Sequence, residues 1–245
     1  MLRVNRRRPV WIPVGLRSRG VGSFRQLFST HVASAWARQV EFGRFLDGRS
    51  WAVDIDTGLA TFGGDLTFPI QLLGSEADEE NTWLWAWANV DSELPGQLLQ
   101  LVTWVREYGR EHEISELIVD SLSLAKIQGH DLAMVCGGLA GGLPYYRGSY
   151  AGGALFFAVE RPPSEVVAPL PPERIPTVLS EVLARFELDH RIAVENFLSQ
   201  QGYQVVDHGS QLTGTRPDGS SCHMEFDDVG RLSRIDLKLT PPSHG

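Results

Sequence analysis

The residues best suited to binding are three tryptophans that recur at every second position. Residues 82–89 read TWLWAWAN, in which one residue separates Trp83 from Trp85 and one separates Trp85 from Trp87. Side chains alternate between the two faces of a β-strand, so the three indole rings share one face, with Asn89 at its end. Three indoles in a row can line an apolar cleft. Alternatively they pack beneath a helix as core, since buried aromatic residues are usually structural.

Two carboxylates on another segment could hold a metal ion. Asp54 and Asp56 lie two residues apart, a spacing that suits Mg²⁺ binding or acid–base work. However, Asp56 also opens a turn at residues 57–58, and no third ligand follows at a suitable spacing. We therefore expect neither a metal nor another cofactor.

A short pattern near the C-terminus suggests a different chemistry. Asp218 follows a proline, and Asp236 stands two residues before Lys238, a string that resembles the PD-(D/E)xK nucleases. In those enzymes two acids bind the metal and the lysine polarises a water molecule. Here Asp218 lies in a Pro-Asp-Gly turn and a further hairpin separates it from Asp236. A turn and an exposed strand explain both acids, and a metal-dependent nuclease is the third hypothesis.

The remaining nucleophiles and metal ligands do not form a recognisable set. Ser121 and Ser123 lack the GxSxG setting of a hydrolase nucleophile. His130 and His223 have no second ligand at metal-binding spacing. Catalysis usually requires titratable groups that converge, so the pattern leans away from an enzyme.

Hydrophobic periodicity predicts the elements that position these residues. The expected helices are residues 23–47, 94–108, one from Ser123 to the glycine run 137–142, 175–186 and 189–202. The expected strands are residues 51–56, 59–62, 66–73, 82–90, 117–119, 145–147, 154–160, 203–207, 211–215, 221–226 and 232–239. This order predicts an α+β fold: an antiparallel sheet with packed helices, followed by a smaller module of two helices and a four-strand antiparallel sheet.

Composition divides the chain into four parts. Residues 1–22 form a basic arm, because residues 1–25 carry seven arginines and no acid, and we expect it to be flexible. The main domain is residues 23–160. Prolines mark residues 161–172 as a linker. The small α+β module is residues 173–245.

Net charge and cysteine usage limit the partners and the compartment. The formal net charge is −8 despite the basic arm. The acidic body would repel phosphate backbones, so nucleic acid is an improbable partner apart from the arm. No run approaches the about 18 consecutive apolar residues of a membrane span. Cys136 and Cys222 match no disulfide or metal framework, which predicts reduced thiols and a cytoplasmic protein.

The tryptophan segment also carries a family resemblance. Together with Val53-Asp54, Leu73-Gly74 and Tyr145-Tyr146-Arg147, residues 82–89 make the chain similar to an uncharacterised bacterial family, a domain of unknown function whose hallmark is this strand. The resemblance covers roughly residues 25–160. It implies no activity, cofactor or catalytic residue, because the family has none assigned. Tyr145, Tyr146 and Arg147 join the tryptophan strand as candidate ligand-binding residues.

These observations favour a non-enzymatic binding or protein-interaction protein of the bacterial cytoplasm. Its expected partner is a protein or a small apolar ligand, and no membrane is involved. The alternative is an enzyme or small-ligand binder that uses an aromatic cleft around residues 83–87.

Overall fold

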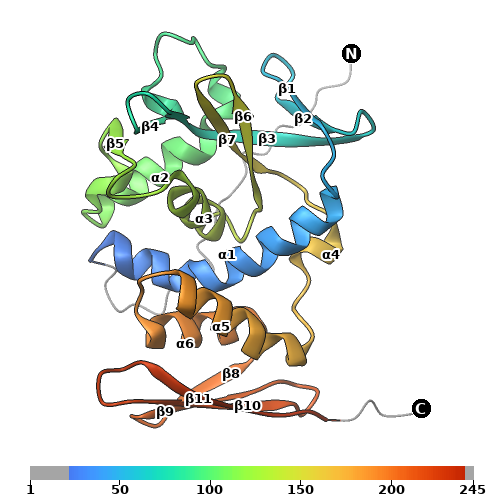
Figure 1. The fold of residues 1–245 in the computed structure, drawn as a ribbon, viewed down its shortest axis with the longest axis vertical. Helices are drawn as coiled ribbons and strands as arrows, with labels where there is room; N and C mark the ends of the chain where they lie inside the picture. The colour runs from blue at the N-terminus through green and yellow to red at the C-terminus, as the bar shows by residue number, and fades with distance from the viewer. Residues whose placement is uncertain (1–21, 241–245) are drawn as a thin grey trace.

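A computed structural model of the chain describes residues 22–240, so almost all of the predicted basic arm lies outside the described residues. The helices are α1 (Phe24–Leu46), α2 (Gln100–Glu111), α3 (Gly129–Leu139), α4 (Ser164–Val167), α5 (Ile175–Arg185) and α6 (His190–Gln200) (Figure 1). Single 3-10 turns are η1 (Ala86–Ala88), η2 (Gly96–Leu98), η3 (Ser115–Leu117) and η4 (Pro172–Arg174).

The strands form two antiparallel sheets. They are β1 (Trp51–Asp54), β2 (Leu59–Phe62), β3 (Leu66–Ala77), β4 (Thr82–Trp85), β5 (Ser121–Ser123), β6 (Tyr145–Tyr150), β7 (Gly153–Val159), β8 (Gln204–Asp207), β9 (Gln211–Thr215), β10 (Ser221–Phe226) and β11 (Leu232–Lys238). The larger sheet follows the order β1-β2-β3-β4-β5, and β7 joins β3 to β6. The smaller sheet has the order β11-β10-β9-β8. The predicted α+β fold class is confirmed.

The long strand β3 organises the larger sheet. Its first residues pair with β2, and from Ile70 onward it pairs with β7 on one side and, from Gly74, with β4. One face of the sheet is covered by α3, which contacts β3, β6 and β7. Cross-strand register places Glu76 opposite Trp83, so these two side chains share that covered face.

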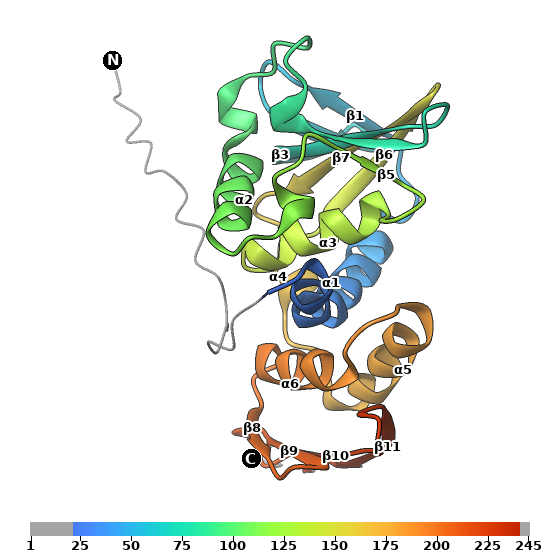
Figure 2. The ribbon, with the colours of Figure 1, turned by 90° about the vertical axis from the view of Figure 1, so that its left-hand side faces the viewer.

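Helix α1 lies between the two halves of the chain. Figures 1 and 2 show the order of the layers: the larger sheet, α2 and α3, then α1, then α5 and α6, and the smaller sheet. The hydroxyl of Ser23 accepts a hydrogen bond from the Gln26 N–H and caps α1, as predicted. Gly138 of α3 allows close packing, because a Cβ there would lie 2.5 Å from His31 of α1.

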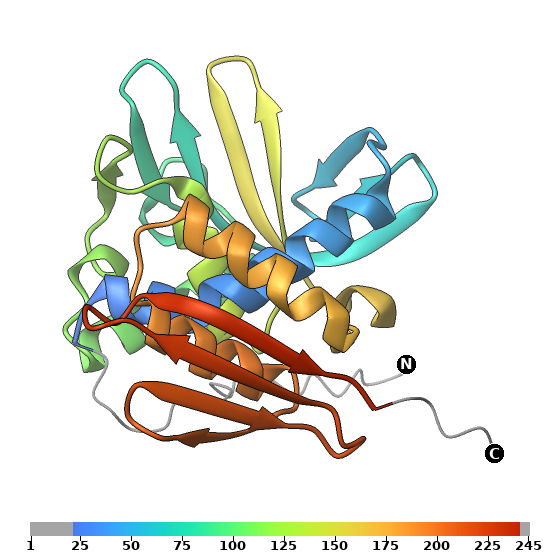
Figure 3. The same ribbon diagram turned by 60° about the horizontal axis from the view of Figure 1, so that its bottom comes forward.

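The smaller sheet buries one face against the helices. Along β10, Cys222, Met224 and Phe226 are buried, whereas the alternate residues are half-buried. Figure 3 views this sheet from below, with α5 and α6 behind it. Period-two alternation of this kind is what the sequence predicted for a sheet covered on one side.

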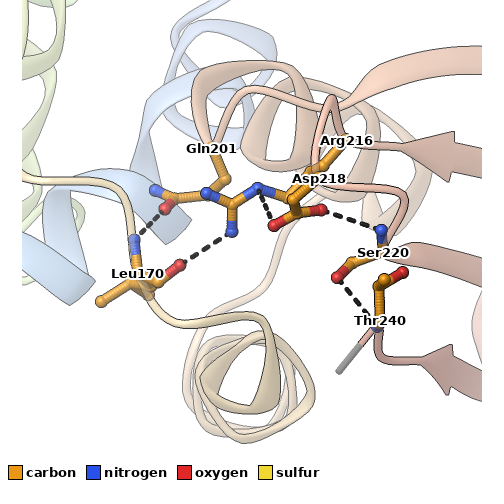
Figure 4. A network of polar contacts seen from close by, with 6 residues as sticks. All are labelled: Leu170, Gln201, Arg216, Asp218, Ser220 and Thr240. Carbon is orange, nitrogen blue, oxygen red and sulfur yellow. Dashed lines mark hydrogen bonds and ion pairs between the residues drawn. The ribbon is translucent and has the colours of Figure 1, made fainter. Parts of the chain in front are cut away.

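The proline-rich segment, residues 161–172, forms hydrogen bonds with the second half of the chain. It holds α4, and Val166 and Leu170 are buried. The Leu170 N–H donates to Gln201 Oε1 at 2.7 Å, and its carbonyl accepts from Arg216 Nη1 at 3.1 Å (Figure 4). Helices α4, α5 and α6 all contact α1. The division of the chain at residues 161–172 stays a prediction.

Several predicted boundaries were wrong. The strand expected over residues 82–90 ends at Trp85, because β3 and β5 pair with β4 no farther along the chain than this residue. Strand β3 instead runs on to Ala77, beyond its predicted end at residue 73. The strand expected at 117–119 is a 3-10 turn followed by β5.

The predicted start of the third helix was also wrong. Ser123 does not cap a helix, because it pairs with Thr82 in β5. Helix α3 begins after Gln128, whose N–H donates to the Asp131 carboxylate at 3.4 Å. A carboxylate in the first helical turn is favoured by the helix dipole, and this contact explains the later start.

Candidate functional site

Trp83 and Trp85 lie inside the protein, with 0% of either residue exposed. Their rings meet edge to face at 5.4 Å, and Trp83 meets Phe156 in the same way at 5.1 Å. Trp85 Nε1 donates to the Glu116 carbonyl at 3.1 Å. Gly74 makes room for Trp83, because a Cβ at this position would lie 2.4 Å from the ring. The core interpretation is confirmed for this pair of tryptophans.

Trp87 does not share their face. Because the chain enters η1 after Trp85, the two-residue period is broken and Trp87 turns toward α2. The Arg106 guanidinium carbon lies 3.6 Å from the centre of its ring, a cation–π contact. Asn89 follows η1 and is half-buried. The predicted row of three indoles is therefore a pair and a separate, half-buried ring.

The three candidates on β6 divide between the two faces of the sheet. Tyr146 packs against Trp51, Phe62 and Phe157. Tyr145 is on the opposite face, and its backbone N–H and carbonyl both bond the Gln39 side chain of α1. These two hydrogen bonds join β6 to α1. The Tyr146 ring packs against the hydrophobic core.

Arg147 belongs to a largely buried ion pair. Its Nε and Nη2 lie 2.9 and 2.8 Å from Oε2 of Glu76, whose side chain is 8% exposed. Its Nη1 donates to the Ser149 hydroxyl at 2.7 Å. Glu76 lies beyond the predicted end of the third strand at residue 73, and sequence reasoning did not pair it with Arg147. A paired arginine of this kind has few donors left for a ligand.

Tyr145 and His130 form a hydrogen-bonded pair next to this ion pair. The Tyr145 hydroxyl lies 2.7 Å from His130 Nδ1. Burial lowers the pKa of His130 and raises the pKa of Tyr145. Both groups are therefore neutral, and they share one hydrogen bond whose donor depends on which imidazole nitrogen carries the proton. The residue His130 is exposed overall, although Tyr145 and Phe156 cover one side of its ring.

An open cleft lies elsewhere, between the start of α1, the segment from η3 to α3, and the end of α5. We call it the α1–α5 cleft. Its volume is about 860 Å³, and it is lined by Phe24, Arg25, Phe28, Ser115, Glu116, Val119, Leu122, Ser123, Lys126, Ile127, Gln128, Asp131, Arg185, Phe186 and Glu187. Segments separated by more than 150 residues in sequence thus meet at one site.

Three phenylalanines form the aromatic part of the cleft. Phe24 and Phe28 are largely buried and stack at 6.2 Å, and Phe28 meets Phe186 edge to face at 5.4 Å. Val119 stands at the edge of the cleft and is 39% exposed. The cleft therefore combines a fixed aromatic floor with a rim that solvent reaches.

The charged groups of the cleft differ in how they are paired. Arg25 bonds Glu187 at 3.0 Å across the entrance from α1 to the end of α5. Burial raises the pKa of Asp131. Among residues 22–240, the side chains of Lys126 and Arg185 make no hydrogen bond and no ion pair. The cleft thus holds two cations without a hydrogen bond or close ion pair to a carboxylate, although the positive charge of Arg185 lies near enough to Asp131 to offset part of the rise that burial causes in the pKa of that carboxyl.

The acids that suggested metal chemistry have structural roles. Asp54 accepts hydrogen bonds from the N–H groups of Asp56 and Thr57, which lower the pKa of its carboxyl and close the β1–β2 turn. Asp218 accepts from the Ser220 N–H in the β9–β10 turn, and Arg216 lies 4.0 Å away (Figure 4). Asp236 pairs with Arg234 at 2.9 Å. No group of three metal-ligating side chains occurs within the part of the chain that the structure describes.

Comparison with known proteins places more than half of the chain in one family. Residues 25–162 match DUF6882, described as a family of unknown function. The chain belongs to the DUF6882 family. No curated protein and no solved structure matches it. The expected membership of an uncharacterised family over roughly residues 25–160 is confirmed. No helix within residues 22–240 has the length and apolar character to cross a membrane.

The DUF6882 match supplies only part of the α1–α5 cleft. It includes Phe28 and the wall from Ser115 to Asp131, but it ends before Arg185, Phe186 and Glu187. Sequence reasoning missed these last residues as site candidates, because Phe28 and Phe186 each continue an apolar helical stripe that predicts core. The sequence signal that could have found these residues is Arg185, which directly precedes Phe186 at the end of the predicted helix 175–186.

Proposed function

We propose that this chain is a non-enzymatic binding protein of the bacterial cytoplasm and that it binds a small amphipathic molecule in the α1–α5 cleft. The observation that carries the proposal is an open cleft that combines a largely buried aromatic floor with cations that form no close ion pair. Pockets for small molecules usually measure roughly 300–1,000 Å³ and combine an apolar lining with a few polar groups. The cleft, at about 860 Å³, lies in this range.

The cleft is a better binding site than the tryptophan strand. A ligand could reach Trp83 or Trp85 only after the core opened, because both residues are wholly buried. Opening that core would expose two indoles and cost several kcal/mol. The cleft is open without such a rearrangement, although Phe24 and Phe28 are largely buried and Phe186 is half-buried.

The non-enzymatic part of the proposal has separate support. The titratable pair Tyr145–His130 and the ion pair Glu76–Arg147 are satisfied by internal contacts. Neither pair lines the cleft. Both cysteines are free and buried, which suits a reducing compartment and the cytoplasm.

A cleft-filling variant tests the proposal. Val119→Trp should fill the cleft without touching the core, and Val229→Trp is the matched control, since Val229 is 70% exposed in the β10–β11 turn. A library of small aromatic acids, amines and neutral compounds is screened by melting temperature. A compound at 100 times its Kd adds about 2.7 kcal/mol. For a chain of this size that gain raises the melting temperature by roughly 5–10 °C.

The expected result is that compounds stabilise the wild type and Val229→Trp but not Val119→Trp. Each bound compound should also be recovered unchanged after prolonged incubation with the protein. Equal stabilisation of the two variants, or a library without any stabilising compound, would count against the cleft. A chemically altered compound would count against the non-enzymatic assignment.

A further inference from the structure

We infer that the molecule bound in the α1–α5 cleft is an acid: it carries a carboxylate or phosphate that Arg185 and Lys126 bind, joined to an aromatic or branched apolar group. This inference rests on the proposed function and names the chemical class of its ligand. The inference depends on where the charged side chains of the cleft lie and which of them form ion pairs, and not on the net charge of the lining. The lining contains three cations and three carboxylates, so it has no overall preference for either sign.

The close contacts of the Arg185 guanidinium are with aromatic rings, and the Asp131 carboxylate interacts with it only through space, without an ion pair. Its guanidinium carbon lies 5.0 Å from the ring centre of Trp36 and 5.8 Å from that of Phe186. Glu181, one helical turn earlier, accepts a hydrogen bond from Trp36 Nε1 at 3.0 Å and makes no ion pair with Arg185. Stacking leaves the in-plane N–H donors of a guanidinium open to a carboxylate or phosphate.

The other charges of the cleft are engaged. Glu187 pairs with Arg25, and Glu116 accepts from the Ser115 hydroxyl at 3.0 Å. Asp131 accepts the Gln128 N–H at the start of α3. Lys126 and Arg185 are the cations of the lining that lack such contacts within residues 22–240. Both residues are exposed, so water solvates the two cations in the free protein. An anion whose apolar part contacts the aromatic rings would replace this water with charge-assisted hydrogen bonds.

The floor and the remaining acids restrict the class of anion. Phe24, Phe28 and Phe186 offer apolar contact to a ring or a branched alkyl group. The carboxylates of Glu116, Asp131 and Glu187 would repel a polyanion such as a nucleic acid. The site therefore suits a small molecule with a single acidic group.

A matched set of probes tests the inference. Isothermal titration calorimetry compares 4-phenylbutyrate, its uncharged amide 4-phenylbutanamide, and phenethyl phosphate with the full chain. The carboxylate and the phosphate should each bind at least tenfold more tightly than the amide, which corresponds to about 1.4 kcal/mol. The better of the two anions identifies the acidic group that the cleft prefers.

Arg185→Gln should abolish the preference for the acids over the amide, and Arg185→Lys should retain part of it. Lys238→Gln is the control, because Lys238 is an exposed cation on β11, away from the cleft. An amide that binds as tightly as the acids, with Arg185→Gln unchanged, would overturn the inference but leave the cleft as a binding site. Probes that do not bind, or that bind Val119→Trp as well as wild type, would overturn the inference together with the proposed function.

Discussion

The tryptophan strand and the α1–α5 cleft are two aromatic clusters considered as binding sites, and they differ in how they are built. Trp83 and Trp85 come from one strand and are wholly buried. The cleft takes Phe28 from α1 and Phe186 from the end of α5, and it adds unpaired cations. The strand is part of the buried core, whereas the cleft is open and charged. Aromatic residues that cluster in sequence here support the core, and those that converge from distant segments form the candidate site.

The largest expected effect belongs to the buried core. Trp85→Ala removes a fully buried indole and its hydrogen bond to the Glu116 carbonyl. The free energy of unfolding should fall by about 3–5 kcal/mol, because apolar burial is lost and a cavity remains. Equilibrium urea unfolding measures this change, with the exposed Val229→Ala as control. A Trp85→Ala variant as stable as the control would show that the strand is not core.

The pH dependence of stability is a second property that separates the buried interior from the open cleft. His31 lies in the α1–α3 contact, and burial and the nearby Arg38 lower its pKa to about 4. The unfolded chain therefore binds this proton at higher pH than the folded chain does. Stability from this group is present above about pH 6.5 and is lost as the pH falls toward 4, by roughly 3 kcal/mol.

Urea unfolding at pH 7 and at pH 4.5 measures the loss, and His31→Phe serves as the comparison because phenylalanine cannot be protonated. The wild type should lose more stability than His31→Phe over this interval. Parallel losses in both proteins would mean that His31 is not held neutral in the folded state.

Local patterns predicted much of the fold. The β1–β2 hairpin, the cap of α1 at Ser23 and the alternation along β10 follow from turn residues, capping and periodicity, which act within a few residues. The predicted strand boundaries were wrong where contacts between distant segments determine the ends of a strand. Glu76 lies in β3 because residues 83 and 154 pair with it there, and Arg147, 71 residues later, forms an ion pair with its carboxylate. Strand β4 ends at Trp85 because the chain turns into η1, although β3 extends farther.

The candidate site was less predictable than the fold. Phe28 and Phe186 lie in helical stripes whose pattern is that of core residues, and Arg185 is one exposed arginine among many. Only the packing of α5 against α1 brings these residues together. No spacing rule along the chain connects residues 28 and 186, and no family match covers both halves of the cleft.

The most direct test of the account is a methyl-resolved NMR titration of the isotope-labelled protein with 4-phenylbutyrate. The methyl groups of Val119, Leu122 and Ile127 line the cleft, and those of Leu84 and Val90 report on the tryptophan strand and the turn after it. We expect the largest chemical-shift changes at the three cleft residues, with Leu84 and Val90 unmoved. Changes centred on Leu84 and Val90, with the cleft methyls unchanged, would contradict the central claim and return the binding site to the tryptophan strand.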